Sequence, residues 1–332
     1  MKNPRVILLV IALAMSLALP FLVPSGALLT AERDRLLEEM WEAEDDAGAL
    51  PGGLLALLLP RAHAATAEEQ YALPADFSPG APLDPAGFRE DGYEDPSVSV
   101  RLETVEEEGV VWRIAFVSVA HPTQLRTATA GSPTSSRVAL ISSMAKKQNA
   151  VLALNANYMA NDPVKTSYEY RMGVKVRAKP NRSKDLLVID QNADFRLFVK
   201  SQKAEIDAFL ENGGEIVNAF TFGPALVKDG ELLDLNEDYG YNPRGREPRM
   251  AIGQIAPLTY VVVHAEGRTS ESQGVTHEEL AARMFDLGCM QAFNLDGGNS
   301  ATLVFNGVYY QHKSVDNERA QSDMIYFASG VK

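Results

Sequence analysis

A chain of 332 residues, 46% of them hydrophobic, can bury at least one large core, and its length allows one or two domains. The formal net charge of -13 argues against a nucleic-acid partner, because no basic stripe is present to replace the counterions along a phosphate backbone. The single cysteine, Cys289, excludes an internal disulfide bond and a zinc site built on a cysteine pair.

The N-terminal residues 1–30 are predicted to be a membrane anchor or signal segment. Lys2 and Arg5 precede the continuous uncharged run VILLVIALAMSLALPFLVPSGALL, which is about as long as a bilayer is thick. Basic residues before the run and acidic residues after it orient the remaining chain outward by the positive-inside rule. Small-residue cleavage sites end at Ala27, where the site is weak, and at Ala64, which is unusually far along. The pattern favours an uncleaved single-pass anchor in the cell membrane with an extracytoplasmic domain, and leaves a secreted form open.

Residues 31–95 are predicted to connect this segment to the folded domain. They comprise an acidic helix, a short apolar segment (ALPGGLLALLLP) that cannot span a bilayer, and a stretch rich in Pro, Ala, Gly and Asp. The last stretch lacks a sustained apolar period, which is typical of a linker. The folded domain is therefore expected to cover residues 96–332.

Apolar periods predict alternating strands and helices along this domain. In chain order we expect a hairpin, a helix, a buried strand, a second hairpin and a short helix, at residues 97–120, 135–148, 150–155, 185–199 and 201–214. The second half is expected to hold strands at residues 224–233, 249–255, 258–265 and 290–295, and a hairpin at residues 301–310. Thr276 and Glu279 form a capping box that begins a helix ending at Gly288, and Asn306-Gly307 favours a type I′ turn. We predict an α+β fold: a single domain with a large mixed β-sheet and flanking helices.

The stretch NLDGGNSAT places polar residues between two apolar runs. Gly297 and Gly298 permit positive φ or close backbone approach, so a loop can fold tightly around a bound group. Asp296 would then project beside the backbone N–H groups. An ordinary turn, in which the Asp296 side chain bonds its own backbone, is the alternative.

Other polar clusters interrupt apolar strands in the same way. They read NANYM, FGPALVKDG, EPRMAIG and VVHAEGR, and they begin at Asn155, Phe222, Glu247 and Val262. Together with GVTHEELAARMFDLGCMQAFNLDGGNSATLVFNG and a later NER, their order resembles the phosphodiester glycosidase family from about Val151 to the C-terminus. The chain departs from the family pattern at NANYM, where Asn-Gly-Gly-Phe-Phe is common, and at Asn299, where a third glycine is usual.

The resemblance implies a hydrolase that cleaves an N-acetylglucosamine-like sugar from a sugar-1-phosphodiester in an envelope or exported glycopolymer, such as an exopolysaccharide. The substrate would therefore be a sugar phosphate or glycopolymer, and the membrane would be contacted through the N-terminal segment. The positions that match the family's motifs are Asn155, Gly223, Arg249, Gly253, Asp296, Gly297, Gly298, Ser300 and Arg319.

The chemistry of such a substrate suggests roles for these side chains. Cleavage at the sugar C1 passes through an oxocarbenium-like transition state that a carboxylate stabilises, and Asp296 is the expected carboxylate. Guanidinium groups bind phosphate oxygens bidentately, which favours Arg249 and Arg319, with Arg268 as a third candidate. His264 is expected to act as acid or base, with a structural role as the alternative.

The remaining candidates concern sugar contacts and metals. Tyr158, Tyr168 and Tyr170 are candidates to stack on a sugar ring, with packing in the core or at its rim as the alternative. The substrate-binding set is expected to comprise Tyr158, Asn155, Gly297, Gly298 and Ser300. No histidine pair has zinc-ligand spacing, whereas calcium or magnesium held by Asp and Asn oxygens stays open. A non-catalytic glycan-binding module and a metal-dependent phosphodiesterase that cuts the P–O bond are the alternative functions.

Overall fold

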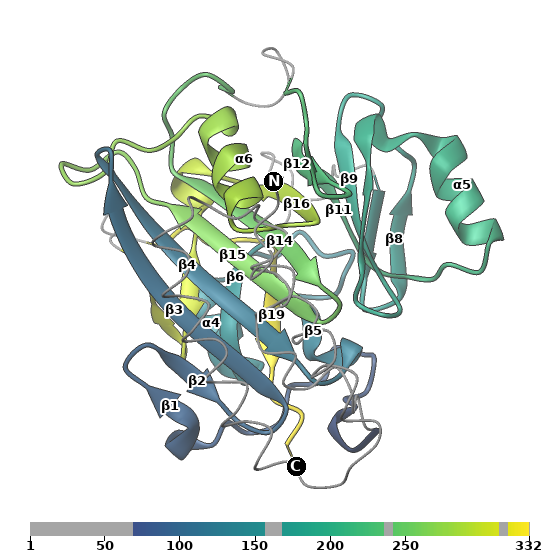
Figure 1. Ribbon diagram of the computed structural model, residues 1–332. Coiled ribbons are helices and arrows are strands. Elements are labelled where there is room, and N and C mark those ends of the chain that lie inside the picture. The colour runs from purple at the N-terminus through teal and green to yellow at the C-terminus, as the bar shows by residue number, and fades with distance from the viewer. Residues whose placement is uncertain (1–68, 157–167, 236–241, 312–317, 332) are drawn as a thin grey trace, which may run out of the picture. The chain divides into compact units, whose positions relative to one another are not determined.

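The computed structural model describes residues 69–156, 168–235, 242–311 and 318–331, and all of them lie in one compact unit, Leu55–Lys332 (Figure 1). The predicted membrane segment lies outside the described residues, as does most of the predicted connecting region. Among the described residues, no helix is long and apolar enough to cross a bilayer. The anchor and the domain boundaries therefore stay predictions.

Three β-sheets build the unit, and the largest has nine strands. Its strands in spatial order are β1 (Phe88–Arg89), β2 (Gly92–Glu94), β3 (Val98–Glu107), β4 (Val110–Val119), β15 (Thr259–Ala265), β14 (Arg249–Ala256), β16 (Gln291–Leu295), β12 (Ala225–Lys228) and β13 (Glu231–Leu232). The second sheet has the order β10 (Phe195–Phe198), β9 (Asp185–Asp190), β11 (Ile216–Phe222), β7 (Tyr168–Arg171) and β8 (Val174–Ala178). The third has the order β18 (Val308–Tyr309), β17 (Leu303–Phe305), β6 (Ala150–Asn155), β19 (Asp323–Ala328) and β5 (Leu125–Thr129).

The prediction of a large mixed sheet is wrong in the direction of the strands, and the strands form three sheets where one was expected. Every strand pair in the described part of the chain is antiparallel. Many of the strands pair with their chain neighbours through short turns, which requires antiparallel pairing. The large sheet and the flanking helices are confirmed, but the strands are divided among three sheets.

Three α-helices lie among the described residues: α4 (Ile141–Lys147), α5 (Lys203–Glu211) and α6 (His277–Asp286). Short 3-10 helices are η2 (Glu69–Tyr71), η3 (Pro85–Gly87), η4 (Pro122–Gln124), η5 (Val199–Ser201) and η6 (Gly298–Ser300). The predicted capping box is confirmed, because the Thr276 hydroxyl accepts from the Glu279 N–H and the Glu279 carboxylate accepts from the Thr276 N–H. Leu280 and Met284 on α6 pack in one apolar cluster with Leu226 of β12 and Ala251 of β14.

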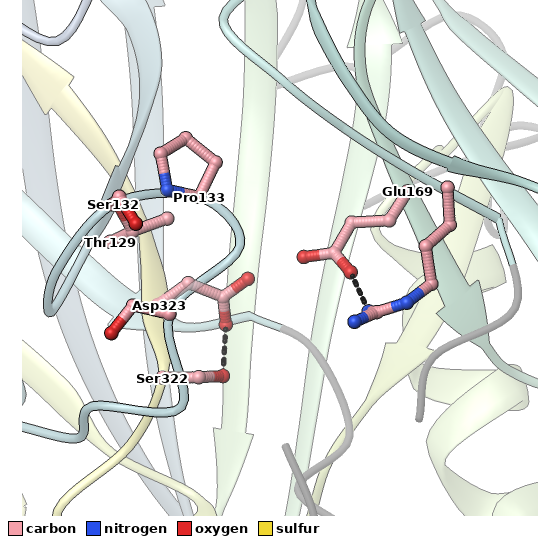
Figure 2. A pocket seen from close by; sticks show the side chains of 8 residues that line it. Thr129, Ser132, Pro133, Glu169, Ser322 and Asp323 are labelled. Carbon is pink, nitrogen blue, oxygen red and sulfur yellow. Dashed lines mark hydrogen bonds and ion pairs between the residues drawn. The ribbon is translucent and has the colours of Figure 1, made fainter. Parts of the chain in front are cut away.

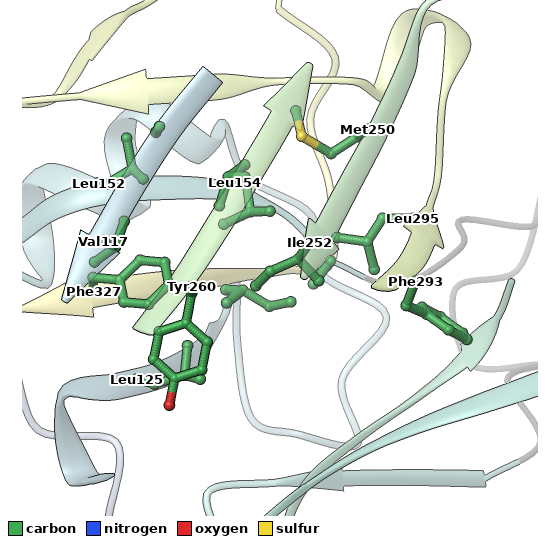
Figure 3. Close-up of a cluster of buried hydrophobic side chains, with 14 of the residues drawn as sticks. Val117, Leu125, Leu152, Leu154, Met250, Ile252, Tyr260, Phe293, Leu295 and Phe327 are labelled. Carbon is green, nitrogen blue, oxygen red and sulfur yellow. The ribbon is translucent and has the colours of Figure 1, made fainter. Parts of the chain in front are cut away.

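The central core joins all three sheets. Figure 3 shows Leu152 and Leu154 of β6, Ile252 of β14 and Phe293 of β16, all of which belong to one buried cluster. Burial of such apolar side chains contributes about 1.5–3 kcal/mol each to folding. The core therefore fixes the end of β6 relative to the end of β16, which matters for the loop that follows β16.

Residues 69–95, expected at the end of the linker, also carry structure. β1 and β2 form the edge of the nine-stranded sheet next to β3. The Gly80 N–H donates to the Gln148 carbonyl at 3.0 Å, and the Ala81 N–H donates to the Ser329 carbonyl at 3.1 Å. This segment therefore packs on the body that the sequence predicted to begin at residue 96.

Candidate active site

The Asp296 loop is the segment by which the chain leaves one sheet and enters another. It follows β16 of the nine-stranded sheet and leads through η6 to β17 of the third sheet. The Asp296 side chain is buried, with 8% of the residue exposed. A carboxylate held there experiences stronger electrostatic interactions than one in water.

Both glycines of the loop are required by its geometry. The Gly298 N–H donates to the Pro248 carbonyl at 2.7 Å, and Gly298 has a φ of 57°. A Cβ added at Gly297 would lie 2.7 Å from the same carbonyl oxygen, closer than real Cβ atoms approach. Larger residues would therefore push the loop away from the segment before β14.

Asn155 fastens the loop from the third sheet. Its side chain is fully buried at the end of β6. The Asn155 Nδ2 donates to the Asp296 carbonyl at 2.8 Å, and its Oδ1 accepts from the Thr302 N–H at 3.0 Å. These contacts give Asn155 a positioning role, and its predicted contact with a sugar stays a prediction.

Ser300 and Arg319 contact each other at the C-terminal end of the loop. The Arg319 Nη1 donates to the Ser300 Oγ at 2.8 Å, while the Gln321 Nε2 donates to the Ser300 carbonyl at 2.6 Å. Ser300 is buried, whereas Arg319 is exposed. The exposed guanidinium therefore lies beside the Asp296 loop. Gln321 belonged to no motif and was missed from the sequence.

Arg268 lies on the rim of the loop. Its Nε and Nη2 lie 2.7 Å and 2.6 Å from the Glu247 Oε2, and its Nη1 donates to the Asn299 Oδ1 at 3.1 Å. The guanidinium also borders Gly298, because a Cβ added there would be 3.5 Å from the Arg268 Nη2. Glu247, which orients this arginine, carried no signal of its own inside EPRMAIG.

Arg249 is held by protein groups at each guanidinium nitrogen. Its Nε donates to the Val275 carbonyl at 3.1 Å, its Nη1 lies 2.6 Å from the His277 Nε2, and its Nη2 donates to the Asn242 and Gly245 carbonyls at 2.7 Å and 3.1 Å. Burial lowers the pKa of Arg249 to about 10, although the negative charge of Glu247 acts to raise it. These bonds anchor residues 242–245 to the start of β14. Its predicted phosphate contact stays a prediction.

We expect Arg249→Lys to lower the free energy of unfolding by about 2–4 kcal/mol, because one ammonium cannot span the groups that the planar fork joins. Thermal unfolding of the variant checks this. Arg246→Lys is a matched control, since the Arg246 guanidinium is 40% exposed and its pair with Glu279 lies at the surface. Equal stability of Arg249→Lys and Arg246→Lys would contradict the anchoring role.

His264 lies two strands from the Asp296 loop. It pairs in register with Met250 of β14, which pairs with Leu295 of β16. Two strand spacings separate the Cα atoms of His264 and Leu295 by about 10 Å. His264 is 2% exposed, and its side chain shares the sheet face of Met250 and Leu295, both of which belong to the central core. The structure places it near the loop, and its acid or base role stays a prediction.

The predicted tyrosine contact cannot be placed. Tyr158 lies outside the described residues. Tyr168 and Tyr170, which follow that segment, are buried and stack on each other with ring centroids 5.5 Å apart. Within the described residues, no group of three or more His, Cys, Asp or Glu side chains could hold a metal ion.

A separate recess lies at the start of β19 and contains none of the predicted site residues. Figure 2 shows Asp323 on one wall and Glu169 on the other, where Glu169 contacts Arg177. Both carboxylates are paired with arginines, since Arg171 contacts each of them. The recess is lined by Thr129, Ser132, Pro133, Ser135, Glu169, Arg177, Ser322 and Asp323.

Comparison with known proteins identifies the family. The sequence profile of the family described as phosphodiester glycosidase matches residues 148–328. The chain belongs to the phosphodiester glycosidase family. The matched region contains β6, the Asp296 loop, Arg249 and Arg319, so the resemblance predicted from the motifs is confirmed. Members of this family are hydrolases of the glycosidase type.

Individual members resemble parts of the chain. The SPbeta prophage-derived uncharacterized protein YomE of Bacillus subtilis (strain 168) is 27% identical over 186 residues, which is 55% of this chain and 28% of that protein. Human N-acetylglucosamine-1-phosphodiester alpha-N-acetylglucosaminidase is 39% identical over 66 residues, which is 20% of this chain and 13% of that enzyme. The chain thus matches less than a third of the length of these relatives.

A solved structure from the same family shares the fold. The catalytic domain of zebrafish N-acetylglucosamine-1-phosphodiester alpha-N-acetylglucosaminidase, auto-inhibited by its pro-peptide, superposes with a TM-score of 0.56 at 18% identity. The match covers 71% of this chain and 84% of that domain. The predominantly β architecture is therefore that of a phosphodiester glycosidase catalytic domain.

Proposed function

We propose that the chain hydrolyses a sugar-1-phosphodiester and releases an N-acetylglucosamine-like sugar from an envelope or exported glycopolymer. The observation that carries the proposal is the buried Asp296 carboxylate in the loop between two sheets, with the Arg268 and Arg319 guanidinium groups beside that loop. Family membership supports hydrolysis of a sugar phosphodiester, and the name of the human relative supports N-acetylglucosamine as the sugar.

The proposed reaction breaks the bond between C1 and the phosphate oxygen. The electron pair of that bond leaves with the phosphate, and water supplies the new oxygen on C1 and the proton for the phosphate. Asp296 stabilises the positive charge that develops at C1, or activates the water. Arg268 and Arg319 bind the departing phosphate, whose charge guanidinium groups match. His264 is the proposed proton carrier.

Hydrolysis in water labelled with oxygen-18 tests this bond cleavage on the full chain. The substrate is an N-acetylglucosamine-1-phosphodiester, and phosphorus NMR of the phosphate product locates the label. Cleavage at C1 yields unlabelled phosphate, whereas a phosphodiesterase that cuts the P–O bond yields labelled phosphate. Binding of the substrate without any turnover would favour the glycan-binding module.

We also propose that residues 1–30 anchor the protein in the cell membrane with the folded unit outside. The support is the long uncharged run and the charge asymmetry around it. We expect the protein to fractionate with membranes and to be cleaved by external protease once the wall is removed. A soluble cytoplasmic protein of unchanged mass would contradict the anchor, and a shorter protein in the medium would indicate secretion.

A further inference from the structure

A buried hydrogen-bond donor at the start of α6 has no partner among the described residues. His277 is 2% exposed, and its Nε2 lies 2.6 Å from the Arg249 Nη1. Burial, together with the charges of Arg249 and Lys184, lowers the pKa of His277 to about 3, so the ring is neutral at physiological pH. A guanidinium can only donate, so Nε2 accepts and Nδ1 carries the proton. Within the described residues the Nδ1 has no hydrogen-bond partner.

A lysine that makes no close ion pair with a carboxylate of the described residues borders the same region. Lys184 precedes β9, is half-buried, and holds its ammonium 5.4 Å from the centroid of the Phe222 ring. Burial lowers the pKa of Lys184. The charge of the neighbouring Asp185 acts to raise the pKa of Lys184, and its two carboxylate oxygens also accept from the Lys200 and Ala225 N–H groups at 2.6 Å and 2.8 Å. The described part of the chain gives Lys184 no ion pair.

Strand register brings these donors to the end of β16. Ala225, whose N–H donates to the Asp185 carboxylate, is the first residue of β12, and α6 packs on this strand. Directly before Ala225, the Pro224 carbonyl accepts from the Asn294 N–H at 3.0 Å, and Asn294 lies two residues before Asp296. Asn294 also pairs in register with Ala251, two residues after Arg249. Lys184, the Arg249–His277 pair and the Asp296 loop are therefore linked through Asn294.

We propose that Lys184 and the His277 Nδ1–H form an anion subsite that binds the phosphate group of the substrate. The inference rests on the proposed function for its place beside Asp296. Lys184 supplies the charge, His277 supplies a neutral donor to a phosphate oxygen, and Arg249 fixes the ring so that Nδ1 carries the proton. A cation and a buried donor that both lack an acceptor within the described part of the chain match a phosphate, which offers several acceptor oxygens.

Binding of inorganic phosphate to the full chain, measured by calorimetry, tests the subsite without requiring turnover. We expect Lys184→Met to raise the Kd for phosphate by about tenfold or more, and Lys184→Arg to retain most of the affinity, because charge-assisted bonds to phosphate are strong. His277→Gln keeps an acceptor for Arg249 but lacks the Nδ1 donor, and should weaken binding as well. In an active enzyme the same variants should raise KM more than they lower kcat.

Lys175→Met is the matched control. Lys175 also lies over an aromatic ring, 5.7 Å from the Tyr170 centroid, but it is exposed on β8. Unchanged affinity in Lys184→Met, or equal weakening in Lys175→Met, overturns the subsite, as does a wild-type chain that binds no phosphate at millimolar concentration. If Lys184→Met unfolds, weaker binding by His277→Gln and retained affinity in Lys184→Arg support the subsite, and the opposite results overturn it. Weaker phosphate binding in the variants of a chain that hydrolyses nothing would leave the subsite standing while the proposed function fails.

Discussion

Asp296→Asn is expected to lower kcat by about three powers of ten or more while KM changes by less than about threefold. Asparagine keeps the size of the side chain and much of its hydrogen bonding but removes the charge that stabilises an oxocarbenium-like transition state. Because Asp296 is 8% exposed, that charge acts in a poorly screened environment, which enlarges its effect. Steady-state kinetics on an N-acetylglucosamine-1-phosphodiester measure the change.

The controls separate chemistry from folding. Thermal unfolding of Asp296→Asn should be close to that of the wild type, because asparagine keeps the size of the side chain and the Asp296 carbonyl and the backbone of Gly298 also hold the loop. Asp234→Asn removes an acidic group from an exposed position and should leave kcat unchanged. Near-normal turnover in a well-folded Asp296→Asn protein would show that the cluster is an ordinary turn and that the chemistry lies elsewhere.

Arg171→Met is expected to lower the free energy of unfolding by about 3–5 kcal/mol, because it leaves a buried carboxylate without its cation. Arg171 is fully buried on β7, and its Nε donates to the Oδ2 of Asp323 on β19 at 2.8 Å. Its Nη1 donates to the Tyr170 and Ala219 carbonyls at 2.7 Å and 2.6 Å. Thermal unfolding should show a midpoint lower by about 10 °C.

Two companion variants identify the cause of that loss. Adding Asp323→Asn to Arg171→Met removes the stranded charge and should recover about 1 kcal/mol or more. Arg177→Met removes a partly exposed arginine from Glu169, which keeps its contact with Arg171, and should cost less than about 1 kcal/mol. If Arg177→Met costs as much as Arg171→Met, burial of the ion pair is not the reason for the effect.

Local signals in the sequence predicted many elements. Thr276 and Glu279 predicted the start of α6 because a capping box satisfies specific backbone groups. Asn306 and Gly307 predicted the β17–β18 turn, and both residues have positive φ, as a type I′ turn requires. β19 was not predicted, although β6, whose six residues are likewise all buried, was. The other strands that were not predicted include β5, β7, β8 and β11. The direction of pairing was also wrong, because partners such as β4 and β15 are set by the tertiary fold.

The sequence likewise predicted some residues of the candidate site and not others. Asp296, Gly297 and Gly298 stood out because three unusual residues interrupt an apolar run, and the structure places them in one tight loop. Lys184 and Gln321 are single polar residues in segments without a motif, and their positions depend on contacts between distant strands. No local pattern in a single sequence could show that Gln321 contacts Ser300 or that Lys184 lies over the Phe222 ring.

Because Asn155 holds the Asp296 loop, the position of the Asp296 carboxylate depends on two sheets. The loop starts on the nine-stranded sheet and ends on the third sheet, and the Asn155 side chain of the third sheet makes two hydrogen bonds with it. The apolar side chains between these sheets therefore set the geometry of the reacting group as well as the stability of the fold. Sequence divergence in that interior can retune turnover or substrate preference while every motif residue stays the same.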